Sequence, residues 1–238
     1  MPAITPNPRL RTILFDLDGT LADTAPDISF ALNTLLDEQG RAPLPYPVIR
    51  PVVSHGSNAL VRLAFGLQPG DPGFDPLKER FLSIYESHLA VDTCLFPGMA
   101  DLLDTLAAQG RNWGVVTNKP GWLTQPLMEQ LGVAGKAACI ISGDTTDHRK
   151  PHPAPMLLAC RQAGSEPAQC LYVGDARRDI EAGKNAGMFT LVALFGYLGG
   201  ADEPLDWGAD AMIHDPAAIL DWILNAEAGA DASPTPYG

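Results

Sequence analysis

Short runs of apolar residues alternate along the chain with segments in which apolar residues recur every three or four positions. The run Ile13-Leu14-Phe15 is the first that is typical of a short buried strand, and similar runs follow at 113–116, 138–141, 170–173, 190–193 and 211–213. The segments between them have the spacing of amphipathic helices. This alternation predicts an α/β fold with a doubly wound, mostly parallel sheet and helices on both faces.

One part of the chain breaks the alternation. Between Thr24 and Ala90 there are three helical patterns and no convincing strand, with proline-rich and turn-rich segments between them. We therefore expect an all-helical insert between the first strand and the rest of the sheet. The domain prediction is a catalytic core at 1–21 and 94–225, a helical cap at 22–93, and a disordered tail at 226–238, where small, acidic and proline residues predominate.

Composition narrows the function classes. The chain has 238 residues, 46% of them hydrophobic and 18% charged, which suits a globular protein with a sizeable core. The formal net charge of −12 argues against a nucleic-acid partner. No apolar run approaches the length of a membrane span, and the proline-rich residues 1–11 do not resemble a signal peptide. Four cysteines without metal-like or disulfide-like spacing indicate buried reduced thiols and hence a cytoplasmic location. We expect a monomer or homodimer.

Two aspartates follow the first strand directly. Asp16 and Asp18 stand at alternate positions before Gly19-Thr20, so their side chains can point to the same side. The carboxyl end of a strand in an open α/β sheet is where ligands bind, and converging carboxylates there require a cation or a shared proton. The same Asp-x-Asp-Gly pattern also occurs in ordinary turns, so the spacing alone leaves a turn and a site open.

Other strands also end in polar residues that suit phosphate chemistry. Thr117-Asn118 closes the strand at 113–116, Lys150 lies in the loop after the strand at 138–141, and Gly174-Asp175 follows the strand at 170–173. Asp175 and Asp179 form an i, i+4 pair that, by itself, is more typical of a helix start than of a metal site. Because the carboxyl ends of these strands meet in one crevice, convergence at a single site explains the set better.

These four motifs together resemble the haloacid dehalogenase superfamily of phosphohydrolases. They are Asp16-Leu17-Asp18-Gly19-Thr20, Thr117-Asn118, Lys150-Pro151, and Gly174-Asp175 with Asp179, and the resemblance spans residues 13–224. It implies a Rossmann-like core, an inserted helical cap and a bound Mg²⁺. It also implies an aspartyl-phosphate intermediate on the way to hydrolysis of a small phosphorylated metabolite.

The resemblance also implies a role for each motif residue. Asp16 would be the nucleophile and Asp18 the general acid and base. Mg²⁺ would be held by the carboxylates of Asp16 and Asp175 and by the backbone carbonyl of Asp18, with Asp179 supporting these ligands. The remaining phosphate-site residues are Thr117, the Asn118 amide, and Lys150, which would pair with the nucleophile and the phosphate charge.

The cap loop bears on the substrate. Val53-Ser54-His55-Gly56-Ser57-Asn58 resembles the corresponding loop of phosphoglycolate phosphatases, so His55, Gly56 and Ser57 are candidate substrate-binding residues. This loop, residues 113–120 and residues 206–210 also look similar to N-acetylmuramic acid 6-phosphate phosphatases, which act in peptidoglycan recycling. His55 is as consistent with a hydrogen bond within the loop as with substrate contact.

The sequence therefore predicts an Mg²⁺-dependent phosphomonoester hydrolase of the phosphoglycolate phosphatase-like branch. The two resemblances share the chemistry and differ in the leaving group, phosphoglycolate or N-acetylmuramate 6-phosphate. A sugar phosphomutase of the same superfamily is an alternative, although the cap lacks the arginine-rich substrate segment that such enzymes typically carry. A non-enzymatic scaffold on this fold is a further alternative, which the intact Asp16, Asp18, Lys150 and Asp175 disfavour.

Overall fold

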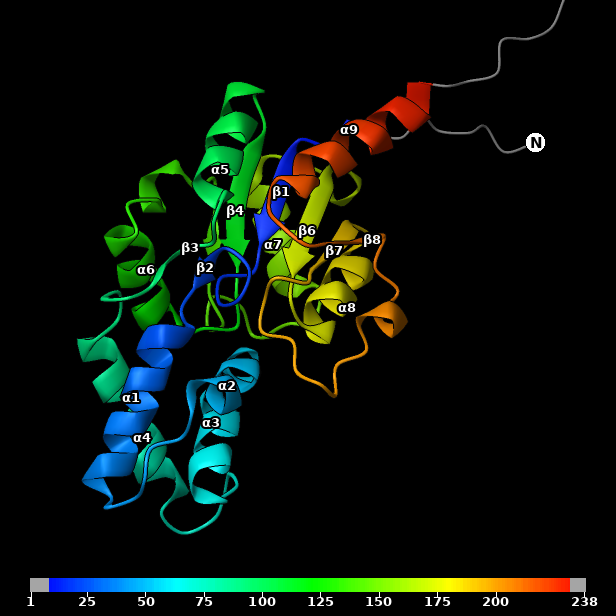
Figure 1. The fold of residues 1–238 in the computed structure, drawn as a ribbon. Coiled ribbons are helices and arrows are strands. Elements are labelled where there is room, and N and C mark those ends of the chain that lie inside the picture. The colour runs from blue at the N-terminus through cyan, green and yellow to red at the C-terminus, as the bar shows by residue number, and fades with distance from the viewer. Residues whose placement is uncertain (1–8, 232–238) are drawn as a thin grey trace, which may run out of the picture.

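A six-stranded parallel sheet lies at the centre of the protein (Figure 1). The computed structural model describes residues 9–231, and within them the strands lie in the order β5-β4-β1-β6-β7-β8. Their bounds are β1 Thr12–Phe15, β4 Asn112–Val116, β5 Ile140–Ile141, β6 Cys170–Gly174, β7 Phe189–Ala193 and β8 Ala211–Ile213. The alternation of strands and helices along the sequence thus produces the predicted doubly wound fold.

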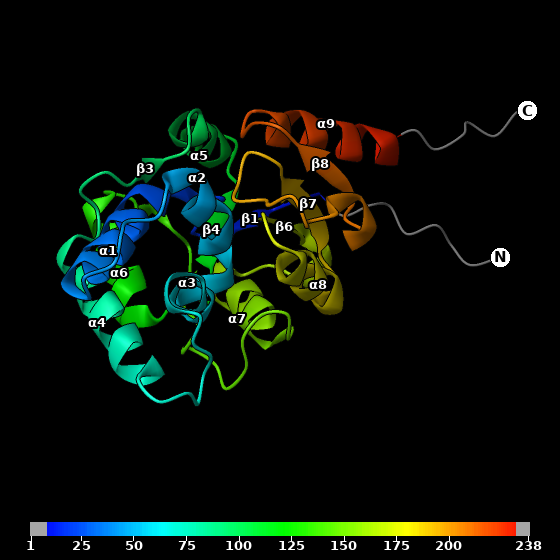
Figure 2. The same ribbon diagram turned by 60° about the horizontal axis from the view of Figure 1, so that its bottom comes forward.

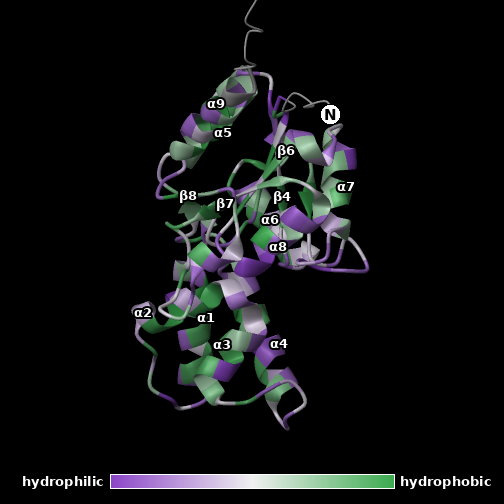
Figure 3. Cartoon of the chain, turned by 90° about the vertical axis from the view of Figure 1, so that its right-hand side faces the viewer, coloured by the Kyte–Doolittle hydropathy of each residue, from purple (hydrophilic) through white to green (hydrophobic). Residues whose placement is uncertain are grey.

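Helices cover both faces of the sheet, and alternate residues of β1 show why. Ile13 and Phe15 belong to one buried apolar cluster with residues of α5, α6 and α9, whereas Leu14 belongs to a second cluster with residues of α7 and α8. The helices are α5 Met99–Ala108, α6 Gly121–Gln130, α7 Ala154–Ala163, α8 Arg177–Ala186 and α9 Ala218–Asp231. Every residue of β1 and β6 is buried, as expected for a sheet covered on both faces. In Figure 3 the surrounding helices carry both green and purple residues, as expected for helices with one face against a core.

The register of the central strands aligns their carboxyl ends. Phe15 pairs with Val115 of β4 on one side and with Val173 of β6 on the other. Asp16, which follows β1, is therefore level with Val116 and Gly174, the last residues of β4 and β6. This alignment places Asp16, Thr117 and Asp175 beside one another, at the edge of the sheet that faces the cap.

The helical insert lies against this edge (Figures 1 and 2). It contains α1 Ala25–Glu38, α2 Tyr46–Ile49, a 3₁₀ helix Arg50–His55, α3 Gly56–Phe65 and α4 Phe74–Ser87. Between residues 24 and 93 the insert consists of helices and the loops that connect them. The chain enters and leaves it through β2 Ala22–Asp23 and β3 Cys94–Leu95, which pair as a short antiparallel ladder.

A buried carboxylate holds the two connecting segments together. Asp27, in the first turn of α1, is fully buried and accepts hydrogen bonds from the backbone N–H groups of Val91, Asp92 and Thr93 at 2.9–3.2 Å. The Thr93 hydroxyl donates to the same carboxylate at 2.7 Å. The exit segment is thus fixed to the start of the cap by a charge whose hydrogen-bonding capacity is met.

Two predicted boundaries differ from the structure. The strand predicted at 138–141 is restricted to β5 at the edge of the sheet, where only one neighbouring strand supports it. The final helix, α9, continues to Asp231, so the prediction of a disordered tail from residue 226 is wrong for residues 226–231. Glu227 in this extension pairs with the buried Arg111 at 2.9 Å and accepts a hydrogen bond from the Leu10 N–H. The rest of the predicted tail, 232–238, lies outside the described residues.

The predictions of reduced cysteines and of no membrane-spanning segment can be compared with the described residues. All four cysteines are free thiols, with Cys139, Cys160 and Cys170 buried and Cys94 exposed. Within residues 9–231 no helix has both the length and the apolar character required to cross a membrane. Of the segment 1–11 that was compared with signal peptides, only residues 9–11 are described.

Candidate active site

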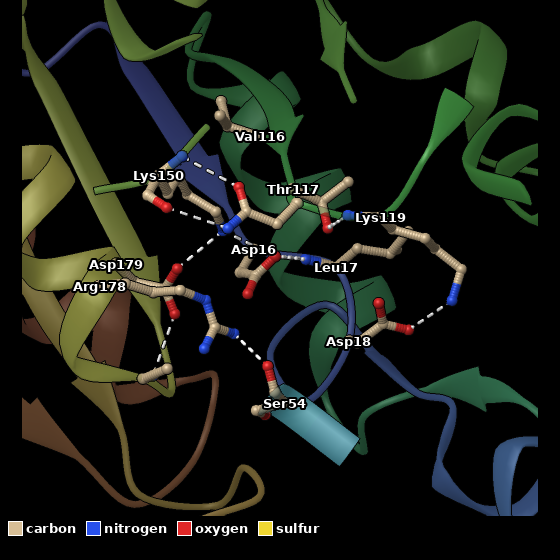
Figure 4. A network of polar contacts seen from close by, with 12 residues as sticks. Asp16, Leu17, Asp18, Ser54, Val116, Thr117, Lys119, Lys150, Arg178 and Asp179 are labelled. Atoms are coloured by element: carbon tan, nitrogen blue, oxygen red, sulfur yellow. Dashed lines mark hydrogen bonds and ion pairs between the residues drawn. The ribbon is translucent and has the colours of Figure 1, made fainter. Parts of the chain in front are cut away.

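Asp16 occupies the first position after β1, at the centre of the sheet edge (Figure 4). Its side chain is almost fully buried, and Oδ1 accepts a hydrogen bond from the Leu17 N–H at 2.7 Å and an ion pair from Lys150 Nζ at 3.0 Å. Within the described chain no group engages Oδ2. One oxygen of Asp16 is therefore fixed by the protein while the other is left for a ligand.

Lys150 is the cation of this centre. Its side chain is fully buried, and Nζ contacts Asp16 and Asp179 and donates to the Tyr172 hydroxyl, at 3.0, 2.7 and 2.7 Å. Three donors on an ammonium thus meet three oxygen acceptors, the arrangement that makes a buried charge tolerable. Asn118 positions the lysine backbone, since its side-chain amide exchanges two hydrogen bonds with the Lys150 N–H and carbonyl at 3.0 and 3.1 Å.

Three buried carboxylates gather beside the lysine. Asp16, Asp175 and Asp179 each offer an oxygen, and these oxygens lie within 4.8 Å of one another. Burial, followed by the charges of Asp16 and Asp179, raises the pKa of Asp175 from 3.8 to about 7. Lys150 and the nearby Arg178 supply two positive charges for three carboxylates, so a bound cation would relieve the repulsion that remains.

The hydrogen bonds of these carboxylates distinguish a metal ligand from a supporting residue. Asp175 Oδ1 is buried and has no hydrogen-bond partner in the described chain. Both oxygens of Asp179 are engaged, Oδ1 by Lys150 and Oδ2 by the Ala176 N–H. An orphaned carboxylate oxygen next to Asp16 fits a hard divalent cation such as Mg²⁺, which prefers few protein oxygens.

Gly19 is required where the loop after β1 approaches Asp175. Its φ of +84° lies in the left-handed region, and a Cβ built there would meet Asp175 Oδ2 at 2.2 Å. Any larger residue would therefore displace the Asp175 carboxylate.

Asp18 belongs to a separate ion pair. Its Oδ1 accepts hydrogen bonds from the Thr24 hydroxyl at 2.7 Å and from Lys119 Nζ at 2.9 Å. Asp18 is not one of the three gathered carboxylates, and within the described chain its Oδ2 has no partner. The repulsion expected between Asp16 and Asp18 is thus relieved by two different lysines, one for each carboxylate.

Lys119 connects this aspartate to the cap. Its Nζ donates to the Tyr85 hydroxyl on α4 at 2.9 Å and lies 4.5 Å from the centre of the Tyr85 ring. Burial alone would lower the pKa of Lys119, but the adjacent Asp18 carboxylate reverses the effect and raises it. Lys119 therefore remains charged between the core and the cap.

Thr117 and Asn118 follow β4 just before the start of α6. Thr117 is buried, and its hydroxyl accepts a hydrogen bond from the Lys119 N–H at 3.2 Å. The Asn118 N–H has no partner in the described chain. A hydroxyl and a free N–H near a helix N-terminus suit the oxygens of a phosphate.

The cap touches the core site directly through Ser54. The Ser54 hydroxyl donates to Asp175 Oδ2 at 2.7 Å. The Ser54 carbonyl accepts a hydrogen bond from Arg178 of α8, which Figure 4 shows. Arg50 adds a second link, with its guanidinium donating to the carbonyls of Gly196 and Phe195 at 2.9 and 3.2 Å. These hydrogen bonds join the cap to the core on the side of Asp175.

A cavity of about 400 Å³ lies between the cap and the core. Asp16, Asp18, Thr117 and Asn118 line its core side. The predicted cap residues His55, Gly56 and Ser57 all line the opposite side. Partial burial, followed by the charge of Arg178, lowers the pKa of His55, so its imidazole is neutral at pH 7. Every predicted site residue except the buried Lys150, Asp175 and Asp179 thus borders this space, and those three lie behind Asp16.

Four contributors were missed by the sequence analysis. Lys119 and Ser54 stand within the quoted motifs but received no role, because their partners Tyr85 and Asp175 are distant in sequence. Arg178 lies in the first turn of α8 and also borders the cavity. Tyr172 is a buried strand residue that accepts from Lys150 and donates to the Val116 carbonyl at 2.7 Å. An aromatic residue inside an apolar strand gives no signal of such a polar role.

Comparison with known proteins agrees with this geometry. A family model described as haloacid dehalogenase-like hydrolase matches residues 13–193. An N-acetylmuramic acid 6-phosphate phosphatase of Pseudomonas putida is 42% identical over 221 residues, covering 93% of this chain and 99% of that protein. A phosphoglycolate phosphatase of Xanthomonas campestris is 44% identical over 209 residues, covering 88% and 94%. A crystal structure described as a predicted phosphoglycolate phosphatase from Haemophilus somnus has a TM-score of 0.80 at 28% identity, covering 90% and 98%.

Proposed function

The chain belongs to the haloacid dehalogenase-like hydrolases and is a phosphatase, and we propose that it hydrolyses a small phosphomonoester through an aspartyl-phosphate on Asp16. One observation carries the mechanism. Asp16 has one oxygen held by Lys150 and the Leu17 N–H and the other unengaged, at the core end of the cavity. An anchored carboxylate with a free oxygen is arranged to act as a nucleophile.

In the first step Asp16 Oδ2 attacks phosphorus, and the bond from phosphorus to the leaving-group oxygen breaks. Asp18 gives a proton from its unengaged Oδ2 to that oxygen, so the leaving group departs as an alcohol. In the second step Asp18 takes a proton from water while the water oxygen attacks phosphorus. Inorganic phosphate leaves, and Asp16 returns to its carboxylate form.

The surrounding residues supply positive charge and orientation to the phosphoryl group. Lys150 neutralises the nucleophile from behind, and the Thr117 hydroxyl and the Asn118 N–H are placed to hold phosphate oxygens. We propose that Mg²⁺ is the cofactor, held by Asp16, Asp175 and the Asp18 carbonyl with Asp179 in support. When bound, the ion would neutralise the phosphoryl oxygens and fix them for in-line attack. The orphaned Asp175 Oδ1 supports this assignment.

The substrate is proposed from the relatives and from the size of the cavity. The two named activities act on N-acetylmuramate 6-phosphate and on phosphoglycolate. A cavity of about 400 Å³ falls in the range of pockets that enclose whole small-molecule ligands, and glycolate would fill a small part of it. The volume therefore supports the sugar phosphate, and with it a role in peptidoglycan recycling, over the two-carbon ester.

The cap is proposed to open and close during turnover. Residues 22–93 would move against the core at 1–21 and 94–225, with hinges near Ala22-Asp23 and Thr93 to Pro97. The paired strands β2 and β3 fall within these hinges, and Ser54 and Arg50 bond the cap to the core in the closed state. Closure would exclude water from the first step and protect the intermediate.

The proposal is tested by phosphate release from N-acetylmuramate 6-phosphate, phosphoglycolate and hexose phosphates on one preparation, with and without Mg²⁺. We expect Mg²⁺-dependent release, with the highest kcat/KM for the first ester. Asp16→Asn should lose at least about 10⁴-fold in kcat while keeping its fold. Asp37→Asn, which neutralises an exposed aspartate of α1, is the matched control.

The same experiment separates the alternatives. An isomerised sugar phosphate without free phosphate would identify a phosphomutase. Absence of turnover with every ester, with the metal present, would leave the protein as a scaffold on this fold. Turnover by Asp16→Asn at the wild-type rate would reject the nucleophile.

A further inference from the structure

One face of the cap helix α4 forms a wall of the cavity. Lys78, Phe81, Leu82 and Tyr85 all line it, and their spacing of three and four residues places them on one side of the helix. Tyr85 is at the core end, because its hydroxyl contacts Lys119 Nζ, which is 2.9 Å from Asp18. The face therefore leads from the catalytic aspartates outward along the cavity.

Lys78 lies at the other end of this face. It precedes Tyr85 by two helical turns, about 10 Å along the helix axis. Helical side chains lean toward the N-terminus of their helix, so the Lys78 stem points away from Tyr85 and from the core. The C-terminal end of α4 leads back to β3 and the core, which confirms that Lys78 is at the outer end.

The Lys78 ammonium is not neutralised by the protein. No carboxylate of residues 9–231 forms an ion pair with it, and it donates no hydrogen bond within that range. The other lysines near the site differ in this respect, since Lys119 and Lys150 each contact a carboxylate. The cavity thus has a phosphate site at one end and an unpaired, half-buried cation at the other.

We propose that Lys78 is a specificity-determining residue that binds a carboxylate on the leaving group, distant from the phosphate. The inference rests on the proposed phosphatase function and deepens it, since it defines the substrate class as an elongated ester with an anion at each end. An ammonium paired with a carboxylate away from bulk water gives a charge-assisted hydrogen bond, and a substrate without the carboxylate cannot form it.

The spacing separates the two candidate substrates. In phosphoglycolate a single CH₂ group joins the ester oxygen to the carboxylate, so its carboxylate would remain beside the catalytic aspartates. In N-acetylmuramate 6-phosphate the sugar ring and an ether oxygen stand between the two anionic groups. Only the second molecule has a carboxylate that can approach Lys78 while its phosphate lies at Asp16.

The middle of the cavity suits such a ligand. Phe81 and Leu82 offer apolar surface from α4, and Ser57 and Asn58 at the start of α3 offer a hydroxyl and an amide. Sugar rings and acetamido groups require this mixture of apolar contact and neutral hydrogen bonds. His55, neutral at pH 7, adds a further neutral polar group.

The test compares two sugar phosphates that differ only in the lactyl ether, N-acetylmuramate 6-phosphate and N-acetylglucosamine 6-phosphate, with phosphoglycolate as a third ester. In Lys78→Met we expect kcat/KM for the first ester to fall by about ten- to a hundredfold, mainly through KM. The other two esters should change by less than about threefold. Lys78→Arg should restore most of the lost kcat/KM. Lys136→Met, which changes an exposed lysine outside the cap, should leave kcat/KM unchanged for all three esters.

The outcomes distinguish the inference from the function on which it rests. Equal losses for the two sugar phosphates, no loss for the first, or an equal loss for phosphoglycolate would overturn the role of Lys78 and leave the phosphatase intact. Failure of the wild-type protein to hydrolyse any of the three esters would reject the proposed function, and the inference with it.

Discussion

The core side and the cap side of the cavity are built differently. On the core side, Asp16, Lys150 and Asp179 are buried, and each contacts at least two of its neighbours at hydrogen-bond distance. On the cap side, His55 and Lys78 are more exposed, and their side chains have no hydrogen bond or ion pair within the described chain. The contrast indicates that the groups for phosphoryl transfer are fixed before substrate arrives, whereas the cap leaves its polar groups for the leaving group.

Two contacts join the sides. Ser54 of the cap donates to Asp175, and Tyr85 of the cap accepts from Lys119, which in turn holds Asp18. Asp175 and Asp18, the proposed metal ligand and acid–base residue, are therefore each linked to the cap by one hydrogen-bonded connection. The predictions below test how far the two sides are independent, beginning with the largest effect.

Lys150→Met should have the largest consequence, since it removes the buried cation that contacts both Asp16 and Asp179. We expect kcat to fall by at least about 10³-fold and the free energy of unfolding to drop by about 3–5 kcal/mol in the absence of metal. Lys136→Met removes an exposed lysine from a surface ion pair with Asp104 and should cost less than about 1 kcal/mol. Kinetics and urea denaturation of both variants give the comparison, and similar losses would show that the core side is not preorganised.

Asp175→Asn should remove metal binding. Mg²⁺ at a hundredfold excess over Kd should add about 2.7 kcal/mol to the free energy of unfolding of the wild-type protein and so raise its unfolding temperature. Neither quantity should change in the variant. Asp104→Asn, at an exposed site, should keep the full rise. An equal rise in Asp175→Asn would place the ion elsewhere.

The raised pKa of Asp175 predicts that the stability of the metal-free protein depends on pH. This pKa is raised from 3.8 to about 7 in the folded state, so the folded state binds more protons than the unfolded state between these values. The contribution of Asp175 to the free energy of unfolding of the metal-free wild type should therefore be largest below pH 4. It should be lost as the pH rises through 7. Urea denaturation at a series of pH values gives the free energy of unfolding as a function of pH, which should be flatter for Asp175→Asn. The same pH dependence in both proteins would show that Asp175 does not have a raised pKa.

Lys119→Met should lower kcat/KM by about 10²-fold, because Asp18 loses the cation that orients it. The loss should be smaller for an aryl ester such as p-nitrophenyl phosphate, whose leaving group departs with little help from an acid. Tyr85→Phe keeps the ring and removes only the hydroxyl, so we expect a change of about fivefold or less. If Lys119→Met affected alkyl and aryl esters equally, its action through Asp18 would be refuted.

Ser54→Ala should have the smallest effect, about 1 kcal/mol on cap closure, measured as faster protease cleavage near residues 22–23 and 93–97. Ser87→Ala is the matched control, since the Ser87 hydroxyl donates within α4 to the Ile84 carbonyl at 2.7 Å and does not reach the core. Identical cleavage of the two variants would show that Ser54 does not hold the cap.

The core could be predicted from the sequence because short apolar runs, each read within a few residues, determine its strands. Apolar runs define β1, β4 and β6, the parallel order aligns their carboxyl ends, and the polar residues that follow must then converge. Asp16, Thr117 and Asp175 required no more than this. The short β5 and the extension of α9 were not predictable from local pattern, since the first depends on its position at the sheet edge and the second on Arg111, far away in sequence.

The cap side could be predicted only in outline. The sequence indicates a helical insert, but the contacts of Ser54 and Tyr85 depend on how the insert packs on the core. Lys78 looks like any lysine on an amphipathic helix until Phe81 and Tyr85 of the same face are seen to line a cavity. The roles of these residues depend on tertiary position, which hydrophobic periodicity does not determine.

The central claim is that phosphoryl transfer proceeds through Asp16. Its most direct test is rapid acid quenching of the protein during turnover of N-acetylmuramate 6-phosphate, followed by peptide mass spectrometry. The account predicts a mass increase of one phosphoryl group on the peptide that contains Asp16, lost on alkaline treatment and absent from Asp16→Asn. A phosphoryl group on another residue, or rapid hydrolysis with no adduct at any quench time, would contradict it.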